Sequence, residues 1–293
     1  MAIDTKELMK AVGKIRILTN RLIDERLSGD YHSVFKGQGV EFDEVRPYVP
    51  GDDIRSIDWN VTARTGEPHI KRFSEERELT VIFLVDVSGS HCFGSRTRSK
   101  SELAAEMTCL LAMTAIRNQD KIGLVLFSDR IVKFIPPRKG RTAVMRLVRE
   151  VLACEETREK TDITAALRFL NGIQKRKAVV FLVSDFQDAD YERELRVTAR
   201  HHDIVACPIA DPCECDLPDV GLIELQDPET GELLLVDTGS SAVRRAFHEQ
   251  AAAAREQLVR FFNRTGIDFI SASTDKPYID EVRALFRRRA RKH

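Results

Sequence analysis

Long hydrophobic runs are missing from this chain of 293 residues. No apolar stretch approaches the roughly 20 residues that a helix needs to cross a bilayer. Residues 1–7 also lack the apolar core of a signal peptide. These two absences predict a cytoplasmic protein without a membrane span, in which the six cysteines are reduced.

Net charge is missing as well, because 46 lysines and arginines are matched by 46 aspartates and glutamates. A chain with balanced charge has no general attraction to nucleic acid or to an anionic membrane. The exception is the basic C-terminal tail at 287–292. Such a tail is typical of a solvated chain end, but nucleic-acid binding through it stays open as an alternative function.

Motifs that would identify an enzyme are missing too. The chain has no glycine-rich loop that continues into Lys-Ser/Thr, and no Ser-His pair placed for nucleophilic catalysis. Cys207, Cys213 and Cys215 lack a matching fourth ligand and therefore make a weak zinc site. A metal-dependent hydrolase or phosphoryl-transfer enzyme stays open as a second alternative.

What the chain does have, after about residue 78, is a regular alternation of apolar strands and amphipathic helices. The runs 79–85 and 178–183 are continuous apolar strands, whereas 142–152 and 240–263 carry apolar residues three and four positions apart. Alternation of this kind indicates an α/β fold. We expect a doubly wound, mainly parallel sheet with helices on both of its faces.

Two turn signals interrupt the predicted main domain. Pro136-Pro137 follows the apolar run 131–135, and we expect the strand to stop there because proline lacks the N–H that a strand donates. The polar segment 227–232 lies between two short apolar runs and contains Pro and Gly. This arrangement predicts a β-hairpin.

The first 77 residues differ in character from the rest of the chain. A helical spacing of apolar residues over about 7–27 is followed by glycines. The stretch from Val40 to Glu75 is then dense in charge and turn residues. We expect an N-terminal segment, 1–77, made of a helix with short strands and loops, and packed on a main domain at 78–293.

Oxygen-bearing side chains follow the predicted strands where those strands end. Asp86, Ser88 and Ser90 come directly after one apolar run, and Asp185 comes after the other. Thr161 opens a polar turn before a helix. If the two strands are parallel neighbours, all five side chains lie at one sheet edge, where open α/β sheets bind ligands. Clustered hard oxygens suit Mg²⁺ or Mn²⁺.

Within this predicted site the hydroxyls and the carboxylates have different roles. Ser88, Ser90 and Thr161 would offer neutral oxygens to the cation, while Asp86 and Asp185 would hold its waters and balance its charge. An open position on the cation would then accept an Asp or Glu side chain of a partner protein. Asp-x-Ser-x-Ser alone is a weak signal, since Asp and Ser also cap helices and fill turns.

A second polar cluster surrounds Trp59, the only tryptophan, between Asp52 and Arg64. One interpretation is a salt-bridged loop that packs the N-terminal segment onto the sheet. The other is a second surface for a partner.

The spacing Asp86-x-Ser88-x-Ser90, then Thr161, then Asp185 resembles the metal-ion-dependent adhesion site of von Willebrand factor A domains. The order of predicted elements from 79 to 272 is similar to that fold as well. Two positions depart from the pattern. The sequence Arg158-Glu159-Lys160 stands before Thr161 where glycines are usual, and His91 follows the serines where an apolar residue is common.

Several sequence strings, spread over nearly the whole chain, resemble the bacterial domain-of-unknown-function family 58 (DUF58). They lie at 27–33, 37–42, 50–55, 57–65, 71–77 and 136–140. Members of that family carry an A-type domain and commonly accompany MoxR-type AAA+ ATPases, with no defined catalytic activity. The resemblance therefore implies a metal-dependent protein–protein interaction module that is a partner or adaptor of such an ATPase. Its partners would be the ATPase and a client that supplies an Asp or Glu to the metal.

Overall fold

The structure is a computed structural model, and it describes residues 40–75, 79–89, 98–154, 160–226 and 233–292. The chain divides into two compact units, of which the smaller is Phe35–Leu79 and the larger is the remainder. The predicted helix at 7–27 lies outside the described residues. The packing of 1–77 on the main domain stays a prediction.

The smaller unit is built on a two-stranded antiparallel sheet. β1 (Val40–Pro47) pairs with β2 (His69–Glu75), and the turn η2 (Ile54–Ser56) and helix α2 (Trp59–Thr65) connect them. Asp58 begins α2, because its carboxylate accepts hydrogen bonds from two backbone N–H groups of the first turn. The short strands and loops expected for this part of the sequence are therefore present.

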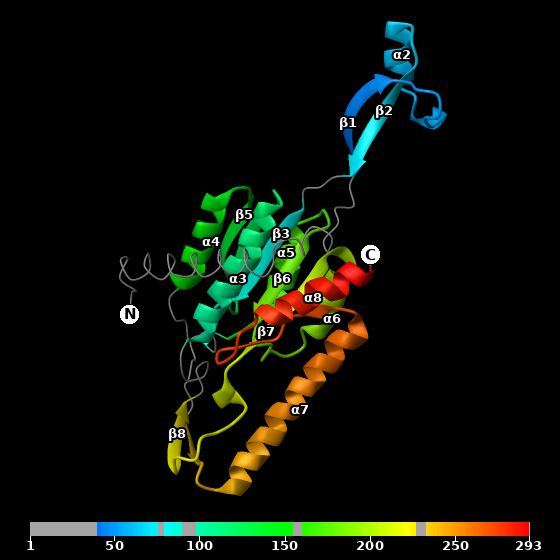
Figure 1. The fold of residues 1–293 in the computed structure, drawn as a ribbon. Coiled ribbons are helices and arrows are strands. Elements are labelled where there is room, and N and C mark those ends of the chain that lie inside the picture. The colour runs from blue at the N-terminus through cyan, green and yellow to red at the C-terminus, as the bar shows by residue number, and fades with distance from the viewer. Residues whose placement is uncertain (1–39, 76–78, 90–97, 155–159, 227–232, 293) are drawn as a thin grey trace. The chain divides into compact units, whose positions relative to one another are not determined.

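The larger unit contains a seven-stranded sheet within the described residues, with the order β10-β7-β6-β3-β4-β5 and with β11 beside β7. Every pairing is parallel except that of β4 with β5. This arrangement confirms the predicted mainly parallel α/β sheet (Figure 1). The strands are β3 (Thr80–Asp86), β4 (Lys121–Phe127), β5 (Ile131–Arg138), β6 (Val179–Ser184), β7 (Asp203–Ala210), β10 (Asp268–Phe269) and β11 (Ala272–Ser273).

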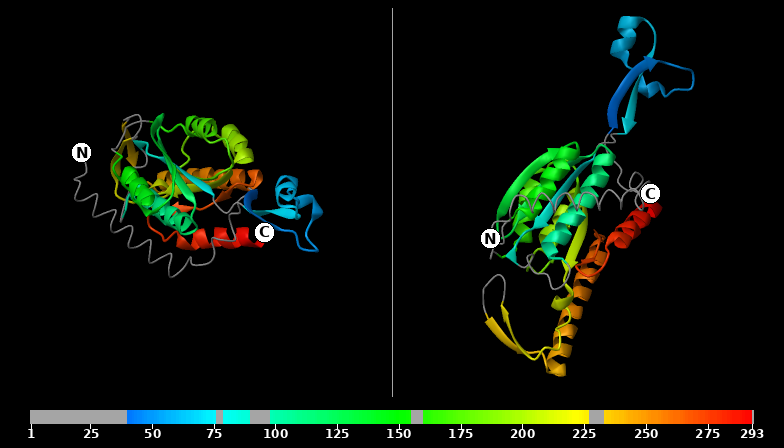
Figure 2. Two further views of the ribbon diagram at one scale, coloured as in Figure 1. Left: turned by 90° about the horizontal axis from the view of Figure 1, so that it is seen from above. Right: turned by 60° about the vertical axis from the view of Figure 1, so that its left-hand side comes forward.

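Helices cover both faces of the sheet, as the two views of Figure 2 show. On one face, side chains of α5, α6 and α7 pack on Ile82 and Leu84 of β3 and on their neighbours in β6 and β7. The alternate residues of β3 point to the opposite face, which α3, α4 and α8 cover. The helices are α3 (Lys100–Arg117), α4 (Arg141–Leu152), α5 (Ile163–Ile173), α6 (Glu192–His201), α7 (Ser241–Thr265) and α8 (Ile279–Lys292).

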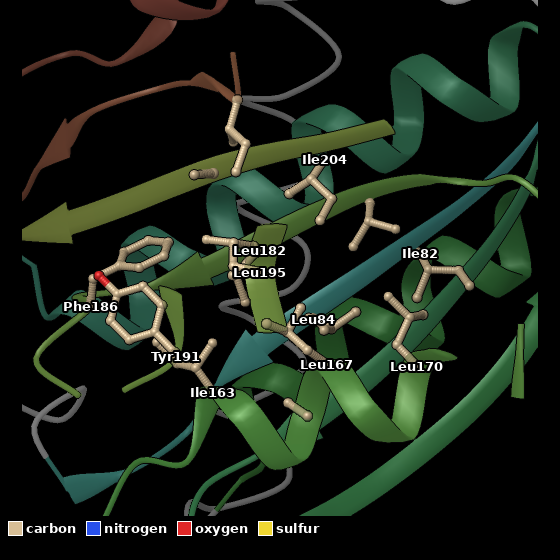
Figure 3. Close-up of a cluster of buried hydrophobic side chains, with 14 of the residues drawn as sticks. Ile82, Leu84, Ile163, Leu167, Leu170, Leu182, Phe186, Tyr191, Leu195 and Ile204 are labelled. Atoms are coloured by element: carbon tan, nitrogen blue, oxygen red, sulfur yellow. The ribbon is translucent and has the colours of Figure 1, made fainter. Parts of the chain in front are cut away.

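The apolar core fixes the position of the sheet edge. Figure 3 shows Leu84 and Leu182 on the strands facing Leu167 of α5 and Leu195 of α6. All four side chains are fully buried. Burial of each contributes roughly 1.5–3 kcal/mol, so β3 and β6 are held firmly where they end.

The strand β5 differs from the prediction, because it continues through Pro136 and Pro137 to Arg138 instead of stopping at the prolines. The prediction was wrong because β5 is an edge strand and its pairing with β4 is irregular between Ile122 and Leu124, opposite the prolines. Sheets tolerate proline at edges and at such irregularities. Pro137 also fits closely over Gly123 of β4, where a Cβ atom would lie 3.1 Å from the proline ring.

The predicted hairpin is present as β8 (Leu222–Gln226) paired antiparallel with β9 (Leu233–Asp237). Its turn, 227–232, lies outside the described residues. Four leucine side chains of this hairpin are more than half exposed: Leu222, Leu233, Leu234 and Leu235. No helix in the part of the chain that the structure describes is long and apolar enough to cross a bilayer.

Candidate metal centre

The strands β3 and β6 are parallel neighbours, with Val85 opposite Val183 in the register. Their carboxyl ends therefore meet at one edge of the sheet. Asp86 is the last residue of β3, and Asp185 directly follows β6. The assumption on which the predicted site depended is thus confirmed by the strand order.

Three of the predicted residues come together at this edge. The Thr161 hydroxyl donates to Ser88 Oγ at 2.8 Å, and it lies 3.4 Å from Asp86 Oδ2. The backbone N–H of Ser88 donates to Asp86 Oδ1 at 3.0 Å. Asp86 and Ser88 are buried, and Thr161 is 9% exposed. One carboxylate and two hydroxyls thus form a compact group of oxygen atoms.

The turn that carries Thr161 is anchored from two sides. The backbone N–H of Asp162 donates to Ser128 O, just beyond β4, at 2.9 Å. The Asp162 carboxylate accepts from Ala165 N at 2.7 Å and so begins α5. Thr161 therefore reaches the site although Arg158-Glu159-Lys160 replaces the usual glycines before it.

Ser184 is a member of the group that the sequence analysis missed. Its hydroxyl donates to Asp86 Oδ2 at 2.7 Å and is fully buried. Ser184 is the last residue of β6, one step beyond Val183, so the parallel register places it beside Asp86. A polar residue at the end of an otherwise apolar strand was the signal that could have found it.

Asp185 lies at the same edge but has a different partner. Its Oδ2 accepts a hydrogen bond from Lys100 Nζ at 2.9 Å, and its Oδ1 accepts from Gln187 N at 3.2 Å. Lys100 also donates to Glu214, in the turn η4 (Pro212–Glu214). Sequence reasoning missed both, since Lys100 is read as an ordinary surface residue at the start of a helix.

The ammonium of Lys100 stays charged despite complete burial. Desolvation lowers its pKa, but the negative charges of Asp185 and Glu214 more than offset that effect, and the pKa lies above its ordinary value. A fixed positive charge therefore lies beside the predicted metal site.

Asp188 adds another carboxylate near the group. Its side chain accepts hydrogen bonds from Ile163 N at 2.8 Å and from Ala189 N at 2.7 Å. Burial raises the pKa of Asp188, and the charges of Asp162 and Asp86 raise it further. Crowded negative charge of this kind is relieved by a cation.

The donor set suits a hard divalent cation. Asp86, Ser88 and Thr161 present oxygen atoms, which Mg²⁺ and Mn²⁺ prefer, and no thiol or imidazole is among them. Among the described residues no group of three or more His, Cys, Asp or Glu could hold a metal ion, here or elsewhere, so the donor set at this edge depends on hydroxyl oxygens. Ser90 and His91 lie outside the described residues, so their part in the site stays a prediction.

A cavity of about 920 Å³ opens beside Asp185. Its walls are the loop after β6, α6, the end of β7 with η4, and α7. Phe247, Ala251 and Leu258 of α7 give it an apolar lining, while Asp188 and Arg255 lie among its polar residues. The volume is that of sites that accept small ligands or several side chains.

The cluster around Trp59 is described within the smaller unit alone. Asp52 forms two hydrogen bonds with the Arg46 guanidinium, at 2.6 and 2.9 Å, and this contact lowers the pKa of Asp52. Asp58 pairs with Lys71 at 3.3 Å. Ion pairs are therefore present within the smaller unit, while the packing of this segment onto the sheet stays a prediction, and Trp59 is 69% exposed.

Part of the basic tail is packed into the folded domain. Arg289, at 7% exposure, contacts Asp203 at 2.7 Å and Asp268 at 2.7 Å. This arginine holds α8 against the ends of β7 and β10, so it is not available to nucleic acid.

Comparison with known proteins agrees with the strings noted in the sequence. The family described as "Protein of unknown function DUF58" matches residues 44–257. This chain belongs to the DUF58 family.

The protein "Rv1480" of Mycobacterium tuberculosis is 30% identical over 283 residues, which cover 96% of this chain and 89% of the relative. "MAV169" of Mycobacterium avium is 28% identical over 160 residues, 54% of this chain and 94% of the relative. The DUF58 description carries no assigned enzymatic activity.

Solved structures with a similar fold are more distant from this DUF58 protein. BatB of Bacteroides thetaiotaomicron has a TM-score of 0.47 and 14% identity over 73% of this chain and all of its own. An aerotolerance-related membrane protein of Bacteroides fragilis has a TM-score of 0.45 and 13% identity, with the same coverage. The VWA domain of SpRpn10 has a TM-score of 0.38 and 12% identity over 71% of this chain and 95% of its own.

Proposed function

We propose that this DUF58 protein is a protein–protein interaction module whose contact depends on Mg²⁺ or Mn²⁺ at the β3–β6 edge. The observation that carries the proposal is the convergence of the Asp86, Ser88 and Thr161 oxygens at the ends of neighbouring parallel strands. Ser90 is proposed as a further hydroxyl ligand, and Asp185 as a group that balances charge.

Each residue of the site has a separate task in this proposal. Ser184 and the backbone N–H of Ser88 fix the orientation of the Asp86 carboxylate. Ser88 and Thr161 present hydroxyl oxygens from two different loops. When bound, the cation supplies an electrophilic position that a partner carboxylate can occupy.

The cavity beside Asp185 explains how one partner would be selected among many acidic proteins. A carboxylate alone offers little specificity, because Asp and Glu are common on protein surfaces. Apolar side chains next to that carboxylate would enter the cavity along α7. The partner is proposed to be a MoxR-type AAA+ ATPase or its client, on the strength of the family resemblance.

The test is isothermal titration of Mg²⁺ and Mn²⁺ into the full chain, with wild type compared with Asp86→Ala. We expect saturable binding that the substitution abolishes. Glu256→Ala is the matched control, because Glu256 is an exposed acidic residue of α7 that pairs with Arg260 and is not among the residues that line the cavity. Binding lost equally in this control would contradict the proposal in the same way as binding that survives in Asp86→Ala.

A further inference from the structure

Lys100 breaks two general rules for lysine. It is the first residue of α3, where the helix dipole opposes a positive charge. Its side chain is also fully buried, although removing an ammonium from water is costly. Residues that break such rules while the surrounding fold stays regular are candidates for a functional role.

The Lys100 ammonium joins two segments that are far apart in the sequence. It contacts Asp185, directly after β6, and Glu214, the last residue of the turn η4 that follows β7. Glu214 Oε2 in turn accepts from the backbone N–H of Asp211, which closes the capping box of η4. Lys100 therefore holds the loop after β6 and the turn after β7 together.

The contact between Lys100 and Asp185 reduces the net negative charge that a cation at the sheet edge would meet. The contacts described for Asp86 come from neutral donors, namely the Ser184 hydroxyl, the Thr161 hydroxyl and a backbone N–H. Asp185 instead has a full positive charge beside it at 2.9 Å. A positive charge near a cation site weakens cation binding, because the two charges repel each other at short range.

We propose that Lys100 is a positioning residue that serves as the internal counter-cation of the metal centre. It holds Asp185 in place while no divalent cation is bound, and it keeps the affinity for Mg²⁺ and Mn²⁺ low. This inference deepens the proposed function and rests on it. Because affinity is low, occupancy rises when a partner carboxylate adds negative charge, so cation and partner bind together.

The first test is Lys100→Met in the full chain, which removes the positive charge and keeps an unbranched side chain of similar length. Titration with Mn²⁺ is expected to show binding about tenfold tighter than in wild type, or more, since the repulsion is removed. Thermal unfolding is expected to shift downward without divalent cation and to recover when Mn²⁺ is added. Lys175→Met is the matched control, because Lys175 is an exposed lysine at the end of α5.

The second test moves the affinity in the opposite direction. Glu214→Gln removes one of the two carboxylates that share the ammonium, so Lys100 then neutralises Asp185 alone. We expect Mn²⁺ binding several-fold weaker than in wild type. The side chain of Glu214 is 21% exposed and the substitution is nearly isosteric, so this variant decides the matter if Lys100→Met does not fold.

The outcomes separate this inference from the proposed function. One outcome is that wild type binds Mn²⁺ in a way that requires Asp86, while Lys100→Met and Glu214→Gln have the same Mn²⁺ Kd as wild type. This outcome overturns the role of Lys100 and still supports the metal centre. Absence of binding in wild type and in every variant overturns both. Tight binding in Lys100→Met that disappears in the double variant Lys100→Met/Asp86→Ala supports both.

Discussion

The ends of β3 and β6 carry the same type of residue in different surroundings. Asp86, on β3, accepts hydrogen bonds from hydroxyls and a backbone N–H, whereas Asp185, after β6, pairs with the buried ammonium of Lys100. Both carboxylates lie on one edge of one sheet. The difference shows that a sequence motif predicts where acidic groups gather but not which hydrogen-bond donors surround each of them.

The largest expected effect comes from breaking the Lys100–Asp185 pair. Lys100→Met is expected to lower the free energy of unfolding by about 3–5 kcal/mol without divalent cation, because it leaves a buried carboxylate uncompensated. Asp185→Asn is expected to be destabilising as well, and the double variant to lose less than the sum of the two. Urea unfolding of the four proteins in EDTA measures this, and strictly additive losses would contradict the pairing.

A smaller effect is expected at Asp188, whose pKa is raised by burial and, to a lesser extent, by the charges of Asp162 and Asp86. A carboxyl with a higher pKa in the folded state contributes stability below its unfolded pKa and loses it as the pH rises through the folded pKa. The unfolding free energy of Asp188→Asn relative to wild type should therefore increase from pH 3 to pH 7, by less than about 1 kcal/mol after solvent screening. Guanidinium unfolding of both proteins at pH 3 and pH 7, without divalent cation, measures this difference in unfolding free energy. A gain in stability that is larger at pH 3 than at pH 7 would refute the prediction.

The smallest effect is expected in the smaller unit. Trp59→Ala removes a side chain that is 69% exposed, so the unfolding free energy should change by less than about 0.5 kcal/mol. Mn²⁺ titration of this variant should match wild type, since the described donors lie in the larger unit. A lost or weakened Mn²⁺ isotherm would show that the division of roles between the two units is incorrect.

The sheet was predictable because its strands are continuous apolar runs that alternate with amphipathic helices. Asp86 and Asp185 were predictable for the same reason, since each follows directly where such a run ends. Ser184 and Lys100 were not predicted, because their roles depend on which strand lies beside β3 and on which helix begins close to Asp185. Those contacts arise from strand order and packing, and no local spacing encodes them.

The strand β5 was mispredicted for a related reason. Proline at 136 and 137 reads locally as a strand terminator, and its effect depends on whether a further strand lies outside β5. In the structure β5 is the edge of the sheet, so the prolines are tolerated.

These two prolines have a consequence for how the molecule behaves in a crowded solution. An exposed strand edge recruits strands from other molecules through its free N–H groups. Pro136 and Pro137 have no N–H, and proline on an edge strand reduces such pairing. At the other edge of the sheet, β10 is only two residues long. We therefore expect little intermolecular growth from the edges of the main sheet. Within the described residues, the exposed leucines of the β8–β9 hairpin are the stronger candidate for the start of aggregation.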